Sequence, residues 1–416
     1  MSATAEIITI GDEILYGQTL DTNSHWMSSK LDEIGIKVRY KTTVGDVKED
    51  ILNSFKAAEE RVDIVLITGG LGPTKDDLTK PLLNEYFQSH LVLNEAALED
   101  ITAIFAKSGR PVTPINRQQA EIPAVCERVP NKLGTAPGMW FPKGDKVFIS
   151  MPGVPFEMRR MMTDTILPRL QKQFVDQVIY HQMIRTIGVG ESALAEIISD
   201  WEDNLPTHMK LAYLPTLGMV KLRLTAIGTN YEALKDNCKQ QVTLVEPLIK
   251  QYIYGYDDRE LEYHMGQILF KAGKTIAFAE SCTGGYLSHL MTTIPGSSAY
   301  YAGSVVSYSY DVKENVLGVD HETLETKGAV SEEVVRQMAE SVRKKLNTDI
   351  GISISGIAGP DGGTEEKPVG TVWIAYSDKE KTVAKKFNFS KDRVLNIQYS
   401  AYMALNMFRL NFAGAV

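Results

Sequence analysis

The stretch VDIVLITGGLGP at residues 62–73 decides the fold of the first third of the chain. Its first seven residues form a nearly continuous apolar run, which is typical of a strand covered on both faces of a parallel sheet. The glycine-rich turn Gly69-Gly70-Leu71-Gly72-Pro73 follows this run directly. Because a glycine turn at the end of a buried strand leads into a covering helix, the stretch predicts a βαβ unit.

The same alternation extends to both sides of this strand. Strand-like runs lie at residues 5–10, 37–44 and 147–151, and helical patterns lie between them. Strands that alternate with helices form a mainly parallel sheet with helices on both faces. We therefore predict that residues 1–169 form a three-layer α/β domain.

The pattern changes in residues 170–256, where long strands and helices follow one another in mixed order. We expect a small α+β domain there. Its turn Gly188-Val189-Gly190-Glu191 is compatible with a nucleic-acid-binding glycine loop or with a simple helix start. Because no basic residues surround the turn, we favour the structural interpretation.

Residues 257–416 return to the alternating pattern. Strand-like runs at residues 275–279, 301–308 and 349–357 are separated by helical patterns, and two later runs suggest an antiparallel pair. This pattern predicts a second three-layer α/β domain. The predicted fold class is therefore α/β: two such domains with mainly parallel sheets, joined by the small α+β domain.

Composition indicates an ordinary globular chain. Apolar residues make up 44% of its 416 residues, and the net charge is -8, which disfavours nonspecific nucleic-acid binding. The three cysteines are scattered, as expected in a reducing compartment. The sequence holds no apolar run long enough for a membrane span, and its first ten residues do not resemble a signal peptide. We expect a cytoplasmic protein without nucleic-acid or membrane partners.

The first candidate catalytic corner is AESCTGG, residues 279–285. Ser281 stands where a strand ends and a helix begins, so unpaired backbone N–H groups there can receive a phosphate or an oxyanion. Gly284 and Gly285 let a ligand approach the backbone, and Thr283 adds a hydroxyl. A serine at this position is also a common helix N-cap, and the local sequence leaves both interpretations open.

A serine nucleophile needs a base, and none of the three histidines of this domain lies at a strand end. A lysine can serve if burial or a neighbouring charge lowers its pKa. Lys313 and Tyr308 lie at or just after the end of the strand at residues 301–308. Because the carboxyl ends of parallel strands share one edge, we expect both to meet Ser281 there. A lone lysine early in a helix is otherwise a solvated charge.

Two more features lie at the same predicted edge. Cys282 is a competing nucleophile, because a helix N-terminus lowers a thiol pKa, although a cysteine beside a strand end is more often buried. We rank it second to Ser281. The loop SISGIAGPDGG at residues 353–363 contains Ser355 and Gly356. It is either an ordinary loop or, as its glycine density favours, a backbone cradle for ribose or phosphate.

Four segments resemble the C-terminal domain of the CinA family: AESCTGG at 279–285, GSVVSYSYDVK at 303–313, KGAVSEEV at 327–334 and SGIAGPDGGTEEKPVGTV at 355–372. That domain is a nicotinamide-nucleotide amidohydrolase, or NMN deamidase. The resemblance implies Ser281 as nucleophile, Lys313 as its base and Tyr308 as an assisting residue. It implies no cofactor, and it implies substrate contacts from Thr283, Gly284, Ser355 and Gly356.

The second corner is TGGLGPTKDD, residues 68–77. A strand, a glycine turn and a helix start again describe a phosphate cradle. Asp76 and Asp77 can bind a hard cation such as Mg²⁺ beside a pyrophosphate, and Asp12 and Glu13 end the first strand near the same crevice. Acids at a helix start also stabilise the helix dipole, which is the interpretation we prefer for Asp76.

This corner, with GDEILYGQTLDTNS at residues 11–24 and SMPGVPFEM at 150–158, resembles the molybdopterin-binding domain of MoaB and MogA type in its CinA variant. The resemblance implies a divalent-metal-dependent ADP-ribose pyrophosphatase. It assigns the metal to Asp12 and Asp77, and the pyrophosphate to the loop formed by Gly69, Gly70, Leu71, Gly72, Pro73 and Thr74. The middle segment is similar to the KH-like domain of full-length family members.

Three function classes follow from these patterns. The first is a deamidase with a second hydrolase at its N-terminus, acting on nicotinamide mononucleotide and ADP-ribose. The second has a non-catalytic molybdopterin- or nucleotide-binding module at the N-terminus. The third, a competence-related adaptor, rests only on the family's historical name and is disfavoured by the acidic charge. Related proteins suggest a homodimer.

Overall fold

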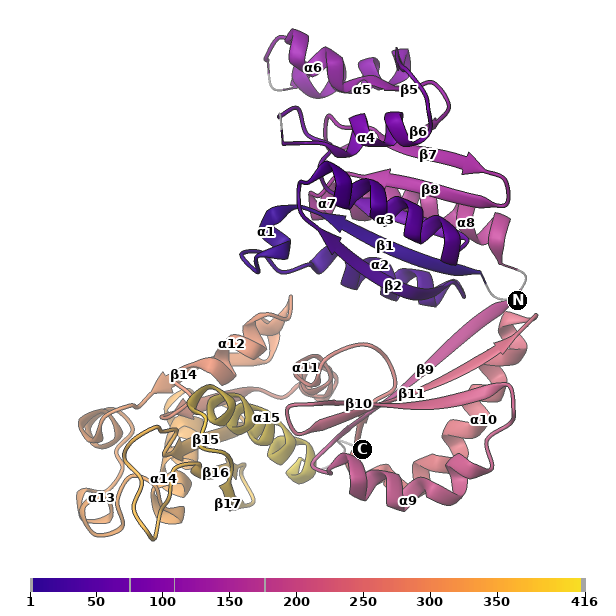
Figure 1. The fold of residues 1–416 in the computed structure, drawn as a ribbon. Helices are drawn as coiled ribbons and strands as arrows, with labels where there is room; N and C mark the ends of the chain where they lie inside the picture. The colour runs from indigo at the N-terminus through magenta and orange to yellow at the C-terminus, as the bar shows by residue number, and fades with distance from the viewer. Residues whose placement is uncertain (1–2, 75, 108, 176, 413–416) are drawn as a thin grey trace. The chain divides into compact units, whose positions relative to one another are not determined.

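The computed structural model describes residues 3–74, 76–107, 109–175 and 177–412 (Figure 1). The chain divides into two compact units. The first comprises Met1–Tyr180 and Ile227–Leu234, and the second comprises His181–Ala226 and Lys235–Val416. Among the described residues, no helix is both long enough and apolar enough to cross a membrane.

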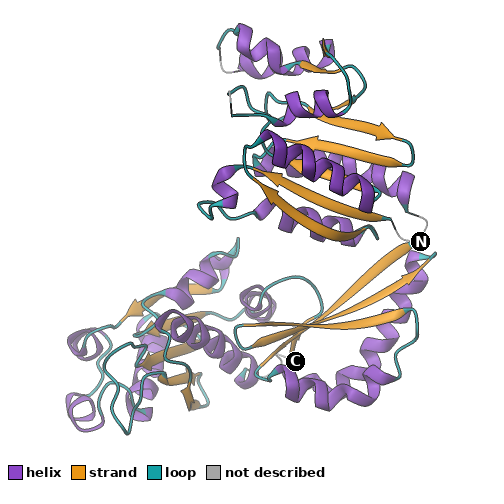
Figure 2. Ribbon diagram, viewed as in Figure 1, coloured by secondary structure: helices purple, strands orange, loops and turns teal. Residues whose placement is uncertain are grey.

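The N-terminal domain is built on a central sheet with strand order β2-β1-β3-β8-β7-β6, in which β1, β2, β3 and β8 run parallel (Figure 2). Its elements are β1 (Thr4–Ile10), α1 (Asp12–Leu15), α2 (Thr22–Glu33), β2 (Lys37–Val44), α3 (Lys48–Arg61), β3 (Ile64–Thr68), α4 (Thr79–Tyr86), β4 (Leu91–Leu93), α5 (Glu95–Lys107), α6 (Pro114–Gln119), β5 (Glu121–Pro123), β6 (Glu127–Val129), β7 (Gly138–Lys143), β8 (Lys146–Met151), α7 (Pro155–Met161), a π-helix (Met162–Ile166) and α8 (Leu167–Phe174).

The two faces of this sheet bury alternate residues of the same strands, as the period of two in a strand requires. Ile7, Leu66 and Ile149 lie in register and pack into a core with α2, α7 and α8. Ile8 and Ile67 belong to a second core with α3 and α4. The sheet is therefore covered on both sides, which is why its central strands are almost continuously apolar.

The middle segment forms an antiparallel sheet of order β10-β11-β9-β12. Its elements are β9 (Val178–Ile187), α9 (Glu191–Asp203), β10 (Met209–Thr216), β11 (Met219–Gly228), α10 (Tyr231–Ile249), a 3-10 turn (Lys250–Tyr252) and β12 (Ile253–Gly255). The turn at Gly188-Val189-Gly190-Glu191 leads directly into α9.

The C-terminal domain has a sheet of order β14-β13-β15-β16-β17. Strands β13, β14 and β15 are parallel, and β16 and β17 form the antiparallel edge. Its elements are α11 (Leu261–Ala272), β13 (Ile276–Glu280), α12 (Tyr286–Thr292), a 3-10 turn (Ser297–Ala299), β14 (Tyr301–Val306), a π-helix (Val312–Val316), α13 (His321–Lys327), α14 (Glu332–Lys345), β15 (Ile350–Gly356), β16 (Thr371–Ser377), β17 (Thr382–Asn388) and α15 (Arg393–Asn411).

The two faces of this sheet carry side chains of different size. Phe278, Ile352 and Tyr376 lie in register and pack against α11, α12 and α15. The opposite face, under α14, is lined by small residues such as Ala279, and at Gly351 an added Cβ would lie 2.2 Å from a carbonyl oxygen of α14. The small residues let α14 pack close to the strands.

The middle segment and the C-terminal domain share one hydrophobic core. Ile187, Met219 and Tyr254 pack into the same cluster as α11, α12 and α15. Two fully buried arginines reinforce the junction: Arg409 donates to the carbonyls of the 251–253 turn, and Arg185 donates to Asp257 and Glu260. The predicted fold class is confirmed: two α/β domains with parallel-containing sheets and a small α+β domain between them.

Candidate functional site

The strand order of the C-terminal sheet determines where its pocket lies. The chain passes from β13 to β14 on one side of it, and then to β15 on the other side. Ligands of open α/β sheets bind outside the carboxyl ends of the strands at such a reversal. Ser281 follows the end of β13 directly, and its backbone N–H donates to the Ile354 carbonyl of β15 at 2.9 Å. The corner is thereby held at the edge of the sheet.

Lys313 comes to the same edge from the π-helix that follows β14. π-helical turns are rare and occur often at functional sites. The side chain is only 1% exposed, and its Nζ lies 3.0 Å from Ser281 Oγ and 2.6 Å from the Ser307 carbonyl oxygen. Among the described residues it forms no ion pair with a carboxylate. Burial therefore lowers the Lys313 pKa from 10.5 to about 8, so an appreciable fraction is neutral near neutral pH.

Cys282 is buried beside Ser281, and its environment differs from that of a reactive thiol. Burial raises its pKa to about 12, and this effect outweighs the nearby positive charge of Lys313. The thiol therefore stays protonated at neutral pH, whereas a nucleophilic cysteine needs a lowered pKa.

Glu280 changes the expectation for the backbone amides of this corner. Its side chain is fully buried and accepts the N–H groups of Gly285, Leu287 and Ser288. The Gly284 N–H donates to the Ser281 carbonyl. The amides at 284 and 285 are therefore already occupied, contrary to the expectation that the whole turn offers them to a ligand. In the described part of the chain, the amides of Cys282 and Thr283 have no acceptor.

The Ser281–Lys313 pair opens into a pocket of about 270 Å³. Its walls are formed by Ser281, Cys282, Tyr308, Lys313, Ala329, Val330, Ser355, Gly356, Ile357, Ala358, Gly359, Asp361, Gly362 and Arg393. Of the predicted substrate-binding residues, Ser355 and Gly356 line it, whereas Thr283, Gly284 and Gly285 are not among its lining residues. The Ser355 hydroxyl donates to the Ala329 carbonyl and so joins two walls of the pocket.

Tyr308 and Arg393 stand together at this pocket. The Tyr308 side chain is 61% exposed, and Arg393 Nη2 donates to its hydroxyl at 3.0 Å. The Tyr308 carbonyl also accepts from Lys313 Nζ at 3.4 Å. Sequence reasoning missed Arg393, which is the first residue of α15 and lies 85 positions from Tyr308. The only signal for Arg393 in the sequence was a glycine-rich loop at residues 359–363 followed later by the start of a helix.

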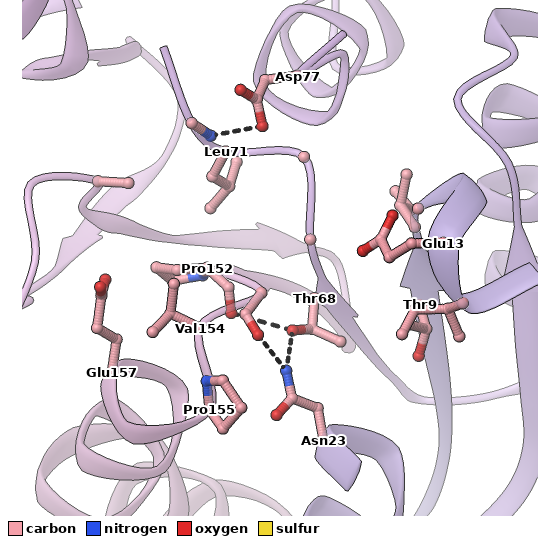
Figure 3. A pocket seen from close by; sticks show the side chains of 18 of the residues that line it. Thr9, Glu13, Asn23, Thr68, Leu71, Asp77, Pro152, Val154, Pro155 and Glu157 are labelled. Carbon is pink, nitrogen blue, oxygen red and sulfur yellow. Dashed lines mark hydrogen bonds between the residues drawn. The ribbon is translucent and has the colours of Figure 1, made fainter. Parts of the chain in front are cut away.

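The N-terminal domain places a larger pocket by the same strand reversal, here from β1 to β2 and then to β3. It measures about 510 Å³ and lies at the carboxyl ends of β1, β3 and β8 (Figure 3). Its described lining includes the carboxylates Glu13, Asp21, Asp46, Asp76, Asp77 and Glu157, and no lysine or arginine. Figure 3 shows Asn23 below Thr68, where its amide nitrogen donates to the Thr68 hydroxyl and the Gly153 carbonyl.

The predicted phosphate loop forms one wall of this pocket. Gly69 has φ +107°, and a Cβ at that position would lie 2.1 Å from the Ile10 carbonyl oxygen, so glycine is required there. Gly70 and Gly72 also line the pocket, and Thr74 donates to Asp77. The amides of Gly70 and Leu71 have no acceptor among the described residues. The loop thus retains the donors that a phosphate needs.

The two predicted metal ligands serve other contacts. The Asp77 carboxylate accepts the N–H groups of Gly72 and Thr74 and the Thr74 hydroxyl. Asp12 does not line the pocket; its carboxylate accepts the Asp46 N–H at 3.3 Å. Across residues 3–412 apart from the undescribed positions, no three His, Cys, Asp or Glu side chains are grouped for a metal. These residues do not fit a metal centre built on Asp12 and Asp77.

Fold and site together define a class: a chain of two α/β domains with separate pockets, of which the C-terminal one holds a buried serine–lysine pair. Three family models match in the same order. They are the "Probable molybdopterin binding domain" at residues 6–172, the "Damage-inducible protein CinA KH domain" at 181–255 and the "CinA C-terminal domain" at 258–412. The chain belongs to the CinA family.

Full-length relatives agree with this assignment. A CinA-like protein from Cytophaga hutchinsonii is 53% identical over 97% of both chains, and one from Flavobacterium psychrophilum is 44% identical over 97% of both. Among solved structures, the protein CinA from Thermoplasma acidophilum is 35% identical, covers 42% of this chain and 99% of its own, and has a TM-score of 0.37.

Proposed function

We propose that the C-terminal domain hydrolyses the carboxamide of nicotinamide mononucleotide to nicotinate mononucleotide and ammonia. The observation that carries the proposal is the 3.0 Å contact between Lys313 Nζ and Ser281 Oγ at the edge of a pocket of about 270 Å³. A serine attacks an amide only when an adjacent base takes its proton. A lysine whose pKa is lowered to about 8 by burial meets that need.

The first half of the reaction is acyl transfer to the serine. Neutral Lys313 accepts the Ser281 proton as Oγ bonds to the carboxamide carbon. The oxyanion that forms is stabilised by the free amides of Cys282 and Thr283, a contribution of about 10²–10³ in rate for each donor in other enzymes. The C–N bond then breaks, and the ammonium of Lys313 returns its proton to the departing ammonia.

The second half releases the acid. A water molecule attacks the acyl carbon while Lys313 accepts its proton, and Ser281 leaves as its oxygen regains that proton. Atoms and charges balance with one water consumed and one ammonia formed. Tyr308 shapes the mouth of the pocket, and its carbonyl helps to fix the amine of Lys313. Every step uses groups of this chain, so no cofactor enters the proposal.

The direct test is release of ammonia from nicotinamide mononucleotide by the full-length chain. Ser281→Ala should remove turnover while leaving the affinity for the mononucleotide within a few-fold of wild type. Asp77→Ala, in the other domain, serves as the matched control and should keep the wild-type rate. Turnover that survives in Ser281→Ala would refute the assignment.

For the N-terminal pocket, the free amides of Gly70 and Leu71 support binding of a phosphate-bearing ligand. Hydrolysis of ADP-ribose with a divalent metal gains no support from Asp12 and Asp77, whose carboxylates organise the backbone. We therefore propose a nucleotide- or molybdopterin-type binding module. Phosphate release from ADP-ribose, coupled to a phosphatase and measured with and without a chelator, separates binding from catalysis.

A further inference from the structure

The short connection between α13 and α14 forms one wall of the pocket that holds Ser281. Ala329 and Val330 both line the pocket from this connection. Their side chains are apolar, whereas Ser281 and Lys313 present a hydroxyl and an amine to the same cavity. A connection outside helices and strands has no regular hydrogen bonds of its own, so contacts with neighbouring elements fix its place. We call residues 328–330 the wall segment.

Both backbone groups of Ala329 are held by side chains from other elements. The Ala329 carbonyl accepts the hydroxyl of Ser355, at the end of β15, at 2.7 Å. Its N–H donates to the hydroxyl of Tyr310 at 3.1 Å. Ser355 follows Ile354, whose carbonyl accepts the Ser281 N–H. The wall segment is therefore tied on one side to the strand that holds the nucleophile, and on the other side to Tyr310.

Tyr310 also belongs to the segment that carries the base. It stands three residues before Lys313, at the start of the helical turn that continues into the π-helix at Val312–Val316. The Lys313 N–H donates to the Ser309 carbonyl, so the base and Tyr310 lie on the same turn. The Tyr310 side chain is not among the lining residues of the pocket. One phenol hydroxyl therefore joins the turn that carries the base to the wall segment from outside the cavity.

Tyr376 gives a comparison within the same domain. Its ring is fully buried in the core, and its hydroxyl donates to Asp378 at 2.8 Å. Like Tyr310, it does not line the pocket. Tyr310, by contrast, is 47% exposed, so its ring adds little to the core. The Tyr310 phenol is placed to hold Ala329 rather than to fill a hydrophobic core.

We propose that Tyr310 is a positioning residue that sets the distance between the wall segment and the Ser281–Lys313 pair. The inference rests on the proposed deamidase function and adds its selectivity for the ring. The pyridine ring of the substrate packs against Ala329 and Val330 while its carboxamide carbon lies at Ser281 Oγ. With the Tyr310 hydroxyl in place, the wall segment leaves room for the unsubstituted ring only. Without it, the Ala329 N–H turns to water, the wall segment moves outward and larger rings are accepted.

Substrates that differ by one ring methyl group test this role. The kcat and KM values are measured by ammonia release for nicotinamide mononucleotide and for analogues with one additional methyl group at each free ring carbon. Wild type, Tyr310→Phe and the control Tyr376→Phe are compared. Wild type should react roughly 10- to 200-fold more slowly with the analogue whose methyl group faces the wall segment, the usual value of one methylene in a closed pocket.

The variants should differ in selectivity and in KM. In Tyr310→Phe the discrimination against the methylated ring should fall by about 5-fold or more, and the KM for the mononucleotide should rise by about 5-fold, the usual value of one neutral hydrogen bond. Tyr376→Phe loses a phenol hydrogen bond without a link to the wall segment, so it should leave both values as in wild type.

These readouts separate positioning from a general loss of stability. A smaller fraction of folded enzyme lowers kcat for every substrate equally and changes neither KM nor the discrimination between rings. Equal discrimination by wild type and Tyr310→Phe would overturn the proposal, and so would a wild type that accepts every methylated analogue as readily as the mononucleotide. A loss of discrimination in Tyr376→Phe as large as that in Tyr310→Phe would also overturn it.

Hydrogen exchange tests the contact itself apart from turnover. The Ala329 amide should exchange about 5-fold or more faster in Tyr310→Phe than in wild type, because it loses its acceptor, and should be unchanged in Tyr376→Phe. If wild type releases no ammonia from the mononucleotide, the deamidase proposal fails, whereas the exchange result stands on its own. Equal exchange of the Ala329 amide in wild type and Tyr310→Phe would independently reject the role of Tyr310.

Discussion

The N-terminal and C-terminal domains have their pockets at the same point of the strand order, but the two pockets are lined by different kinds of residue. In each, the first strand lies between the second and the third, so the pocket lies at the reversal. The residues directly after the N-terminal strands are Gly11, Gly69 and Pro152, whereas Ser281 and Ser307 follow β13 and β14. Strand order thus places each pocket, and the residues that follow the strands give the two pockets different side chains.

The largest expected effect tests the base of the C-terminal pocket. Lys313→Met should reduce ammonia release by at least about 10³-fold, because Ser281 loses the group that accepts its proton. In wild type, kcat/KM should rise with pH and level off above about pH 8, as Lys313 becomes neutral. A flat pH profile from 6 to 9, measured by coupled ammonia assay, would count against this role.

The same substitution should raise stability. The pKa of Lys313 is about 8 in the folded protein, whereas its ordinary value is 10.5. Between pH 8 and pH 10.5 the amine is therefore protonated in the unfolded chain and neutral in the folded one. Because the unfolded chain binds more protons, the free energy of unfolding of the wild type rises with pH in this range. At 1.36 kcal/mol per pKa unit, Lys313→Met should gain up to about 3 kcal/mol below pH 8, less the cost of an unpaired Ser307 carbonyl. The gain should vanish by about pH 10.5, as urea unfolding across pH can show.

The meeting of Ser281 and Lys313 could be predicted because it follows from topology: both stand just past parallel strands that share one edge. The role of Glu280 could not, since a glutamate at a strand end does not reveal which amides its side chain will accept. Arg393 was missed because its contact with Tyr308 depends on how α15 packs. Asp12 and Asp77 show the same limit, because their side-chain directions are set by local hydrogen bonds.

A smaller effect concerns the buried carboxylate beside the nucleophile. Glu280→Gln replaces one acceptor oxygen by an NH₂ group, which faces backbone N–H donors of α12. We expect a loss of about 1–3 kcal/mol in the free energy of unfolding. We also expect kcat to fall by roughly 10²-fold, because a shift of about 1 Å in the backbone that carries Ser281 misplaces the nucleophile. Ser288→Ala removes only one hydroxyl donor to Glu280 and is the matched control. Similar rates for Glu280→Gln and Ser288→Ala would show that the corner does not depend on the carboxylate.

In the N-terminal pocket, Asp77→Ala should affect the loop alone. The substitution removes the acceptor for Gly72 and Thr74, and should cost about 1–2 kcal/mol in the stability of this domain, with weaker binding of a phosphate-bearing ligand. Ammonia release should be unchanged, because Ser281 and Lys313, the residues proposed for the deamidase, lie in the other compact unit. Urea unfolding, ligand titration and the ammonia assay on one preparation check all three points.

The smallest effect is expected for Cys282→Ala. The thiol is buried and its pKa is raised to about 12, so removing it should change kcat/KM by less than about 3-fold, and iodoacetamide should not inactivate wild type at pH 7.5. Rapid, substrate-protected inactivation by iodoacetamide would restore Cys282 as a rival to Ser281.

The core shared by the middle segment and the C-terminal domain has a consequence for dissecting the gene. A fragment that begins at residue 257 would leave the partners of Ile187, Met219 and Tyr254 uncovered and the buried guanidinium of Arg409 without its carbonyl acceptors. Such a fragment would expose an apolar surface that favours aggregation, and it would lose the hydrogen bonds that join Arg409 to the carbonyls of residues 251 and 253. A fragment meant to test the proposed deamidase should instead begin near residue 181, so that it includes the antiparallel β10-β11-β9-β12 sheet of the middle segment.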